Sequence, residues 1–212
     1  MKVTSWKTVA VLAAIASVAL GIGIGAPPSQ AAEMARETAR VEMTLTAGGQ
    51  SSLPLTDRDL TRQEKVNLGT VLTAYRTTEA RSLDAPAFVD TFAPGGVFND
   101  VVAGNSYRGA ALGDVPKYMI SIFPDVHREL KKITVNGDVI SVELAVQGTF
   151  NGSMATPAGT LKGNGAKVDA PMADFWYLHN GKIVKFDCYV GYTALYQQMG
   201  VQLDWASAVG AN

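Results

Sequence analysis

Two aspartates in the second half of the 212-residue chain stand inside otherwise apolar runs, Asp174 in APMADFWYL and Asp187 in KIVKFDCYV. A carboxyl group buried among apolar side chains has a raised pKa, which suits it to take up and release a proton near neutral pH. His127 adds an imidazole that titrates in the same range. These residue types indicate general acid–base chemistry, and Asp187, His127 and Asp174 are the candidate catalytic residues.

Asp187 has a second interpretation. On a strand, Lys185, Asp187 and Tyr189 share one face, whereas Phe186 and Cys188 share the other. If the apolar face is the core, Asp187 points to water as a partner of Lys185, and such surface ion pairs contribute little to stability. If the apolar face is instead the outer face of the sheet, Asp187 lines an interior cavity. The sequence leaves both interpretations open.

The other two candidates also have structural interpretations. Asp174 shares a strand face with Trp176, so it either projects into a cavity or lies exposed where the sheet widens. His127 precedes Arg128 and Glu129, and this neighbourhood is equally typical of a strand edge at the surface.

Missing motifs exclude several other chemistries. The chain has no GxSxG nucleophile elbow, phosphate-binding loop or dinucleotide fingerprint. His127 and His179, the two histidines, lie far apart without clustered acids, so we expect no metal. The single cysteine, Cys188, is expected to be a small buried apolar side chain. We therefore expect no cofactor.

Residues 1–31 have the three parts of a secretory signal peptide. Lys2 and Lys7 precede the uncharged run VAVLAAIASVALGIGIGA, and Ser29-Gln30-Ala31 offers small residues for cleavage after Ala31. An uncleaved anchor is the alternative, because the run approaches the ~20 residues that span a bilayer. Cleavage removes two of the 18 basic and none of the 19 acidic residues, leaving a net charge of -3. We expect a secreted or periplasmic protein without stable membrane insertion and without a nucleic-acid partner.

A helix of about five turns is predicted to open the domain. Thr61 and Glu64 have the spacing of a capping box, and apolar residues at i, i+3, i+4 and i+7 follow from Leu68. Two more helices and a brief strand are expected after it: a helix from Asp84 to near Pro94, the strand VFNDV at 97–101 and a helix over 110–123.

Four strands are predicted to complete the domain. They are expected over 127–135, 139–150, 167–178 and 183–190, with Asn-Gly tight turns between two pairs of them. The segment 151–165, rich in Gly, Ala and Pro, is expected to be a loop. This order predicts an α+β domain over 61–201, with helices packed on one face of a meandering antiparallel sheet. Residues 32–60 are expected to form a linker with a short helix in its first half, and 202–212 a C-terminal tail.

Four segments, in this order and at this spacing, resemble the SnoaL-like polyketide cyclases of the nuclear-transport-factor-2-like superfamily. They are FPD (123–125), NGDVISVELAVQGTFNG (136–152), TPAGTLKGNGAKVDAPMADFWYLHNGKI (156–183) and LYQQMG (195–200). The resemblance implies a cone-shaped α+β barrel, in which a curved antiparallel sheet of four main strands packs against three N-terminal helices around an apolar cavity. In the cyclases, an acid–base residue near the end of the last strand moves a proton during an intramolecular aldol closure.

The chain departs from the family pattern at two positions. The pattern is an aromatic residue followed four positions later by a carboxylate, and alignment without gaps places Asp187 on the first position and Gly191 on the second. Phe150 stands where many relatives carry a histidine, and a phenyl ring cannot transfer a proton. These differences leave Asp187 or Asp174, together with His127, as replacements for the family's own acid.

The resemblance also implies cavity walls that contact a small hydrophobic ligand. The candidate ligand-binding residues are Tyr75, Tyr118, Phe150, Trp176 and Tyr189, whose alternative is ordinary core packing. Three functions are compatible with the sequence: an exported protein that binds a small hydrophobic molecule, a cofactor-free cyclase or isomerase, and a non-catalytic homodimerisation module. The dimerisation module is suggested by a stripe of apolar residues on one face of the last strand, which would need a partner subunit if that face were the outer face of the sheet. These residues are Val184, Phe186, Cys188 and Val190.

Overall fold

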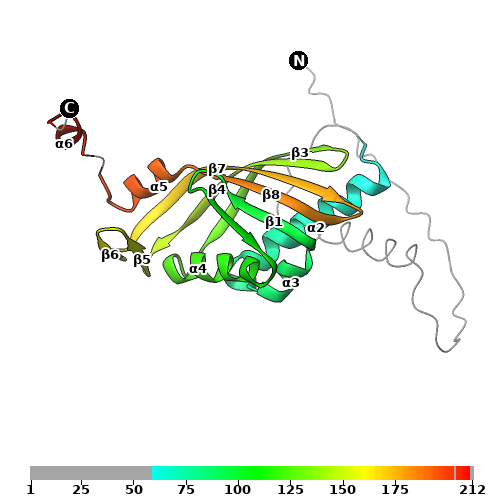
Figure 1. Ribbon diagram of the computed structural model, residues 1–212, viewed down its shortest axis with the longest axis horizontal. Coiled ribbons are helices and arrows are strands. Elements are labelled where there is room, and N and C mark those ends of the chain that lie inside the picture. Colours follow the sequence, from blue (N-terminus) through cyan, green and yellow to red (C-terminus); the bar gives the residue numbers. More distant parts are fainter. Residues whose placement is uncertain (1–58, 203, 211–212) are drawn as a thin grey trace, which may run out of the picture.

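The computed structural model describes residues 59–202 and 204–210. The expected leader at 1–31, and the expected linker as far as residue 58, lie outside the described residues. Figure 1 shows a long curved sheet with the helices α2, α3 and α4 on one side of it. Among the described helices, we found none that is long and apolar enough to cross a membrane.

Helix α2 (Arg62–Thr78) begins where the sequence predicts. The Thr61 hydroxyl accepts the Glu64 N–H at 3.2 Å, and the Glu64 carboxylate accepts the Thr61 N–H at 2.9 Å. The capping box thus satisfies two N–H groups that lack partners inside the helix. The predicted apolar face, from Leu68 to Tyr75, is buried and packs in the core cluster that includes the sheet.

The four predicted strands are confirmed. They are β3 (His127–Asn136), β4 (Val139–Phe150), β7 (Ala166–His179) and β8 (Lys182–Val190). Consecutive members of this set pair antiparallel. In the tight turns, Gly137, Asn180 and Gly181 adopt φ values of 61°, 51° and 75°, the left-handed conformations that short hairpin loops require.

Two further strands extend the sheet, and the first of them contains most of the brief strand predicted at 97–101. Strand β1 (Phe92–Asp100) pairs parallel with β8, and β2 (Asn105–Arg108) pairs antiparallel with β1. The strand order is β2-β1-β8-β7-β4-β3, so β2 and β3 are open edges. The α+β class and the curved sheet are confirmed, but the sheet does not close into a barrel.

The segment Pro94-Gly95-Gly96 lies inside a strand, whereas the sequence predicted that it would end a helix. Helix α3 (Ala85–Asp90) ends before it, and β1 has already begun. The register of β1 against β8 shifts between Phe92 and Val97, and such an irregularity accommodates proline and glycine within a strand.

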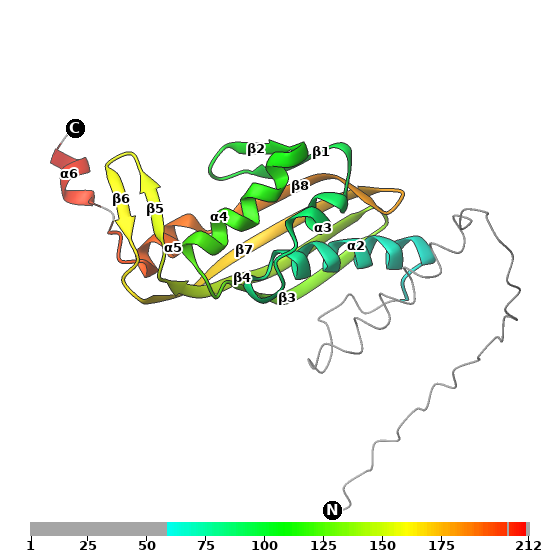
Figure 2. The same ribbon diagram turned by 90° about the horizontal axis from the view of Figure 1, so that it is seen from below.

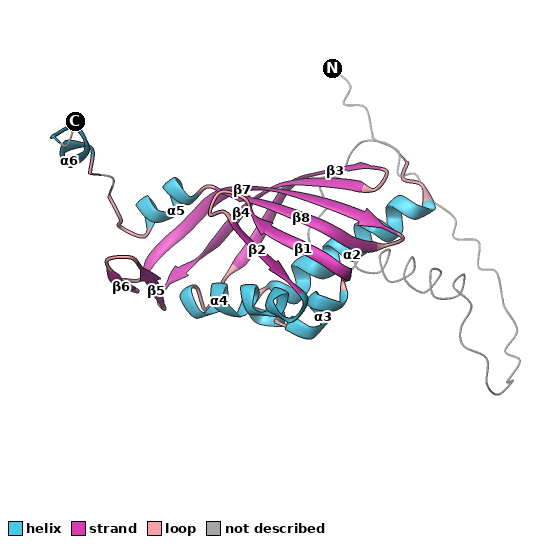
Figure 3. Cartoon of the chain, in the orientation of Figure 1, coloured by secondary structure: helices cyan, strands magenta, loops and turns pink. Residues whose placement is uncertain are grey.

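Several segments differ from the predicted secondary structure, as Figure 3 shows. The expected third helix is divided into the 3-10 turn η2 (Gly109–Gly113) and helix α4 (Asp114–Ile122). The expected loop at 151–165 contains the hairpin of β5 (Ser153–Thr156) and β6 (Gly159–Lys162). The remaining elements are η1 (Ala80–Ser82), α5 (Tyr192–Gln198) and α6 (Trp205–Gly210), which falls in the expected tail.

Two clusters of buried apolar side chains hold the layers together. The first gathers residues of α2, α3 and the adjoining strands, including Trp176. The second gathers residues of β4, β7, α4 and α5, including the fully buried Phe150. In Figure 2, α2 and α3 lie along one part of the sheet, and α4 continues toward α5 and the β5–β6 hairpin.

Candidate active site

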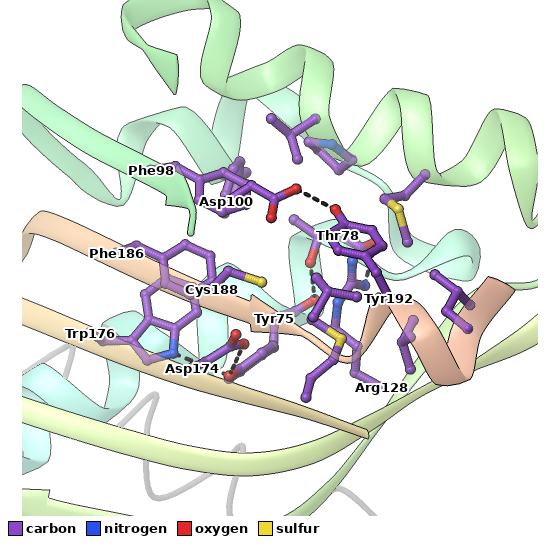
Figure 4. A pocket seen from close by; sticks show the side chains of 18 residues that line it. Tyr75, Thr78, Phe98, Asp100, Arg128, Asp174, Trp176, Phe186, Cys188 and Tyr192 are labelled. Atoms are coloured by element: carbon purple, nitrogen blue, oxygen red, sulfur yellow. Dashed lines mark hydrogen bonds between the residues drawn. The ribbon is translucent and has the colours of Figure 1, made fainter. Parts of the chain in front are cut away.

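A cavity of about 100 Å³ lies between the sheet and the helices (Figure 4). Aromatic rings form much of its wall: Trp176 stacks on Phe186 with 3.6 Å between ring centroids, and Phe186 stacks on Phe98 at 4.6 Å. Drug-sized ligands usually occupy ~300–1,000 Å³, whereas an apolar cavity of ~150 Å³ admits benzene. The volume therefore suits a ligand, or one group of a ligand, about the size of a single ring.

Asp174 presents an unpartnered carboxylate oxygen in this apolar setting. The Tyr75 hydroxyl donates to Asp174 Oδ2 at 2.7 Å, and Trp176 Nε1 donates to the Tyr75 hydroxyl oxygen at 3.1 Å. Asp174 is 2 % exposed, and its Oδ1 atom is buried and accepts no hydrogen bond from the described residues. Asp174 and Trp176 are two residues apart on β7, so both side chains project from the inner face toward α2.

Burial controls the proton affinities around Asp174. It raises the pKa of the Asp174 carboxyl to about 6, while the Tyr75 hydrogen bond, the Cys188 thiol and the Arg128 charge each offset part of this rise. Burial and the Asp174 charge hold the pKa of Tyr75 well above its usual range, so Tyr75 remains a protonated donor. The same two causes raise the pKa of Cys188, which keeps it a thiol and not a thiolate.

Asp187 lies on the outer face of the sheet. Its neighbours Phe186 and Cys188 line the cavity, so successive side chains alternate between the cavity and the outside. Asn99 Nδ2 donates to Asp187 Oδ1 at 2.7 Å, and Lys185 Nζ donates to Asp187 Oδ2 at 2.7 Å. Asp187 therefore does not line the cavity. The predicted pairing with Lys185 is confirmed, but Asp187 is only 8 % exposed, so the pair is not the fully solvated surface pair that was expected.

The same alternation corrects the proposed dimerisation stripe. Phe186 and Cys188 are buried at 5 % and 4 % exposure, and Val190 lines the cavity with them. Val184 is 39 % exposed and does not continue that face. The four residues consequently do not form an outer apolar stripe.

The remaining predicted residues divide between the cavity and other places. Tyr75 and Trp176 line the cavity. Tyr118 is 52 % exposed, Tyr189 is 40 % exposed on the outer face, and Phe150 is in the second core cluster, so the cavity wall includes none of these three.

His127 is also outside the cavity, at the start of β3. Its Nδ1 atom lies 3.0 Å from Glu79 Oε2, and its side chain is 58 % exposed. The structure therefore brings Asp174 together with Tyr75 and Trp176, but not with His127 or Asp187.

Four polar residues of the cavity were not predicted from the sequence: Thr78, Asp100, Arg128 and Tyr192. The Tyr192 hydroxyl donates a short hydrogen bond to Asp100 Oδ2 and so joins the start of α5 to the end of β1. A signal for Asp100 existed, because Phe98 and Asp100 share a face of the strand VFNDV. Arg128 gave none, since its position next to His127 is equally typical of a surface strand. Within residues 59–202 and 204–210, we found no group of three or more His, Cys, Asp or Glu side chains that could hold a metal.

Comparison with solved structures supports the fold. A protein from Jannaschia sp. CCS1 that is classed with the SnoaL-like polyketide cyclases superimposes with a TM-score of 0.59 at 18 % identity, covering 69 % of this chain and 99 % of its own. IdmH from Streptomyces antibioticus, classed as a polyketide cyclase, gives 0.54 at 17 % identity and covers 64 % of this chain and 99 % of its own. A protein from Catenulispora acidiphila with a ketosteroid isomerase-like fold, solved with trimethylamine, gives 0.53 at 19 % identity, with 64 % and 95 % coverage.

Sequence comparison supports the same relationship. No curated protein matches the chain significantly. The model of the SnoaL-like domain, however, matches residues 71–186, which is more than half of the 212 residues. This matched region begins in the middle of α2, contains β1 to β7 and ends at Phe186 in the middle of β8. The chain therefore belongs to the SnoaL-like domain family.

Proposed function

We propose that the chain binds a small, mainly apolar carbonyl compound in the cavity and that Asp174 removes and returns a proton on it. The observation that carries this proposal is the buried Asp174 Oδ1 atom, which accepts no hydrogen bond by geometry from the described residues, although the Cys188 thiol, a weak donor, lies close enough to the carboxyl to lower its pKa. A buried carboxylate oxygen without a partner is energetically unfavourable, and such groups are concentrated at functional sites.

The surrounding hydrogen bonds define what the ligand must offer. The Trp176 N–H occupies one lone pair of the Tyr75 oxygen, and the single Tyr75 proton is directed to Asp174 Oδ2. Asp174 is thus held as an acceptor, with Oδ1 available. A ligand that complements it must present a hydrogen-bond donor or an acidic C–H group there.

The proton affinity of Asp174 also fits a base that works near neutral pH. With a pKa of about 6, the carboxyl is mainly ionised at pH 7 and yet binds a proton more strongly than an exposed aspartate. The same group can therefore take a proton from a carbon next to a carbonyl and return it to another position. Relatives classed as polyketide cyclases, and the relative with a ketosteroid isomerase-like fold, are compatible with this reaction class.

Proton exchange at carbon tests the proposal without knowledge of the natural substrate. Cyclohexanone, a ketone with a single ring, is incubated with the protein in D2O, and NMR measures the loss of the α-proton signals. The Asp174→Asn variant should exchange about 10²–10⁴-fold more slowly than the wild type, the usual contribution of a general base. The matched Asp187→Asn variant removes a carboxylate from the opposite face and should stay within about twofold of the wild type. Equal rates in the wild type and Asp174→Asn would refute the proposal.

We also propose that the protein is exported, on the basis of the predicted leader at 1–31. N-terminal sequencing of protein from the native source should find Ala32 as the first residue. An intact leader in the mature protein would contradict this.

A homodimer is a second proposal, and it concerns the outer face of the sheet. Phe175 and Tyr189 lie there in T-shaped contact at 5.7 Å, with 36 % and 40 % of their surfaces exposed. Native mass spectrometry should detect a dimer that Tyr189→Lys dissociates. A wild-type monomer at micromolar concentration would refute this second proposal.

A further inference from the structure

Arg128 is the cation of the cavity. It lies near the start of β3, lines the cavity, and its side chain is 11 % exposed. The described cavity wall contains no other lysine or arginine, while it contains two carboxylates, Asp174 and Asp100. In an apolar wall, a fixed positive charge acts more strongly on a ligand than it would in water.

Hydrogen bonds hold Arg128 by one end of its guanidinium. Nη1 donates to the Thr78 carbonyl at 2.9 Å and to Glu79 Oε1 at 3.3 Å. A guanidinium has five N–H groups, and those of Nη2 and Nε form no hydrogen bond with the described residues. The side chain is therefore fixed in position and retains donors. The positive charge of Arg128 also acts on Asp174 and Cys188, since it lowers the pKa of both groups.

We propose that Arg128 stabilises the ligand oxygen on which negative charge develops when Asp174 removes the proton. This inference rests on the proposed function. In the step, a C–H bond next to the carbonyl breaks and an O–H bond forms on Asp174 Oδ1. The electron pair of the C–H bond becomes the C=C bond of an enolate, and the carbonyl π pair moves to the oxygen. Returning the proton to carbon reverses these changes, so no other reactant is needed.

The charges of the cavity also define the ligand class. The step moves one negative charge from Asp174 to the ligand oxygen, so the net charge of the cavity is unchanged. A preorganised cation where charge develops is among the largest contributions to catalysis. Arg128 is the one positive charge of the described cavity wall and already pairs with Glu79, while Asp174 and Asp100 are two negative charges. A ligand that arrives as an anion would add a further negative charge, so the proposed ligand is a neutral ketone or diketone.

Binding of 4-nitrophenol tests this role separately from turnover. Its phenolate resembles an enolate, and absorbance near 400 nm reports the ionised form. Asp174→Asn imitates the protonated base and should bind the phenolate in preference to the neutral phenol. Adding Arg128→Met should weaken phenolate binding by about tenfold or more, while the affinity for nitrobenzene, which is uncharged and of similar size, should stay within about twofold.

The ratio of these two affinities separates a charge effect from a structural effect of losing Arg128. Arg128→Lys keeps a charge without the planar fork and should give an intermediate ratio. An unchanged ratio in both Arg128 variants would overturn this inference alone, provided that Asp174→Asn still slows α-proton exchange as predicted. If the wild type binds neither probe and exchanges no α-protons, the proposed function itself is refuted.

Discussion

Asp174 on β7 and Asp187 on β8 belong to adjacent residue pairs of these two strands, yet their side chains face opposite sides of the sheet. Asp174 pairs with Cys188 and faces the cavity, whereas Asp187 pairs with Phe175 and faces outward. The outward carboxylate has the Lys185 ammonium at 2.7 Å, while the inward one has a neutral tyrosine at the same distance. One residue type therefore forms an ion pair on one face and a base with a raised pKa on the other.

The raised pKa of Asp174 predicts a pH-dependent stability. Its pKa is about 6 in the folded protein and near the ordinary 3.8 in the unfolded chain. Between pH 4 and 6 the folded state thus binds more protons, so the free energy of unfolding falls as pH rises, by at most about 3 kcal/mol from this group. Urea denaturation at pH 4, 5, 6 and 7 measures this free energy of unfolding.

The contribution of Asp174 is the difference between the wild type and Asp174→Asn in these denaturation curves. The variant should lack the fall between pH 4 and 6, while Asp187→Asn should retain it. Identical pH dependence in the wild type and Asp174→Asn would contradict the raised pKa.

Tyr75→Phe is predicted to move the acidic limb of the exchange reaction to higher pH. The Tyr75 hydrogen bond lowers the pKa of Asp174, so its removal lets this pKa rise above about 6. The variant also leaves the buried Trp176 N–H without its acceptor, which should destabilise the fold by about 1–3 kcal/mol. The pH profile of α-proton exchange measures the first effect, and a limb that stays or moves to lower pH would contradict it.

Local patterns in the sequence were sufficient for most of the fold. The capping box at Thr61 and the apolar spacing of α2 are properties of a single segment, as are the alternation of β3, β4, β7 and β8 and their Asn-Gly turns. The parallel pairing of β1 with β8 joins residues about 90 positions apart in the sequence, and no local pattern encodes it.

Val184 on β8 was assigned to the wrong face because strict alternation fails near the start of the strand. The β7–β8 register shifts between Leu178, which pairs with Ile183, and Tyr177, which pairs with Lys185. Ile183 is consequently fully buried although it is three residues from Phe186, and Val184 is exposed. Arg128 and Asp100 were missed for a related reason: β1, β3 and β7 meet at the cavity only after the whole sheet has formed.

Restoring the family's carboxylate at Gly191 is predicted to destabilise the protein. A Cβ at Gly191 would lie 2.7 Å from the Pro171 carbonyl oxygen and 3.1 Å from Pro171 Cγ. The Gly191 N–H donates to that same carbonyl at 2.9 Å, so the two backbones cannot separate without losing this hydrogen bond. Gly191→Asp should lower the free energy of unfolding by roughly 2–4 kcal/mol, as overpacking and strain do.

Gly191→Ala separates the steric effect from the charge, because it adds only the Cβ atom. Urea denaturation of both variants should give similar losses of stability. A Gly191→Asp variant as stable as the wild type would contradict the close approach to Pro171.

Tyr192→Phe is predicted to loosen the contact between α5 and β1 at the cavity. The Tyr192 hydroxyl donates to Asp100, and both residues line the cavity, so this bond joins the first residue of α5 to the last residue of β1. Without it, α5 should separate from β1 more often, and small ligands should enter and leave faster. Stopped-flow or NMR exchange with nitrobenzene should show both rate constants raised severalfold, with the dissociation constant nearly unchanged. Two-ring probes such as 2-indanone should gain affinity over one-ring probes, because the closed cavity suits about one ring.

Tyr118→Phe is the control, since that tyrosine is 52 % exposed and does not line the cavity. Equal ligand exchange rates in Tyr192→Phe and the wild type would show that ligands do not pass between α5 and β1.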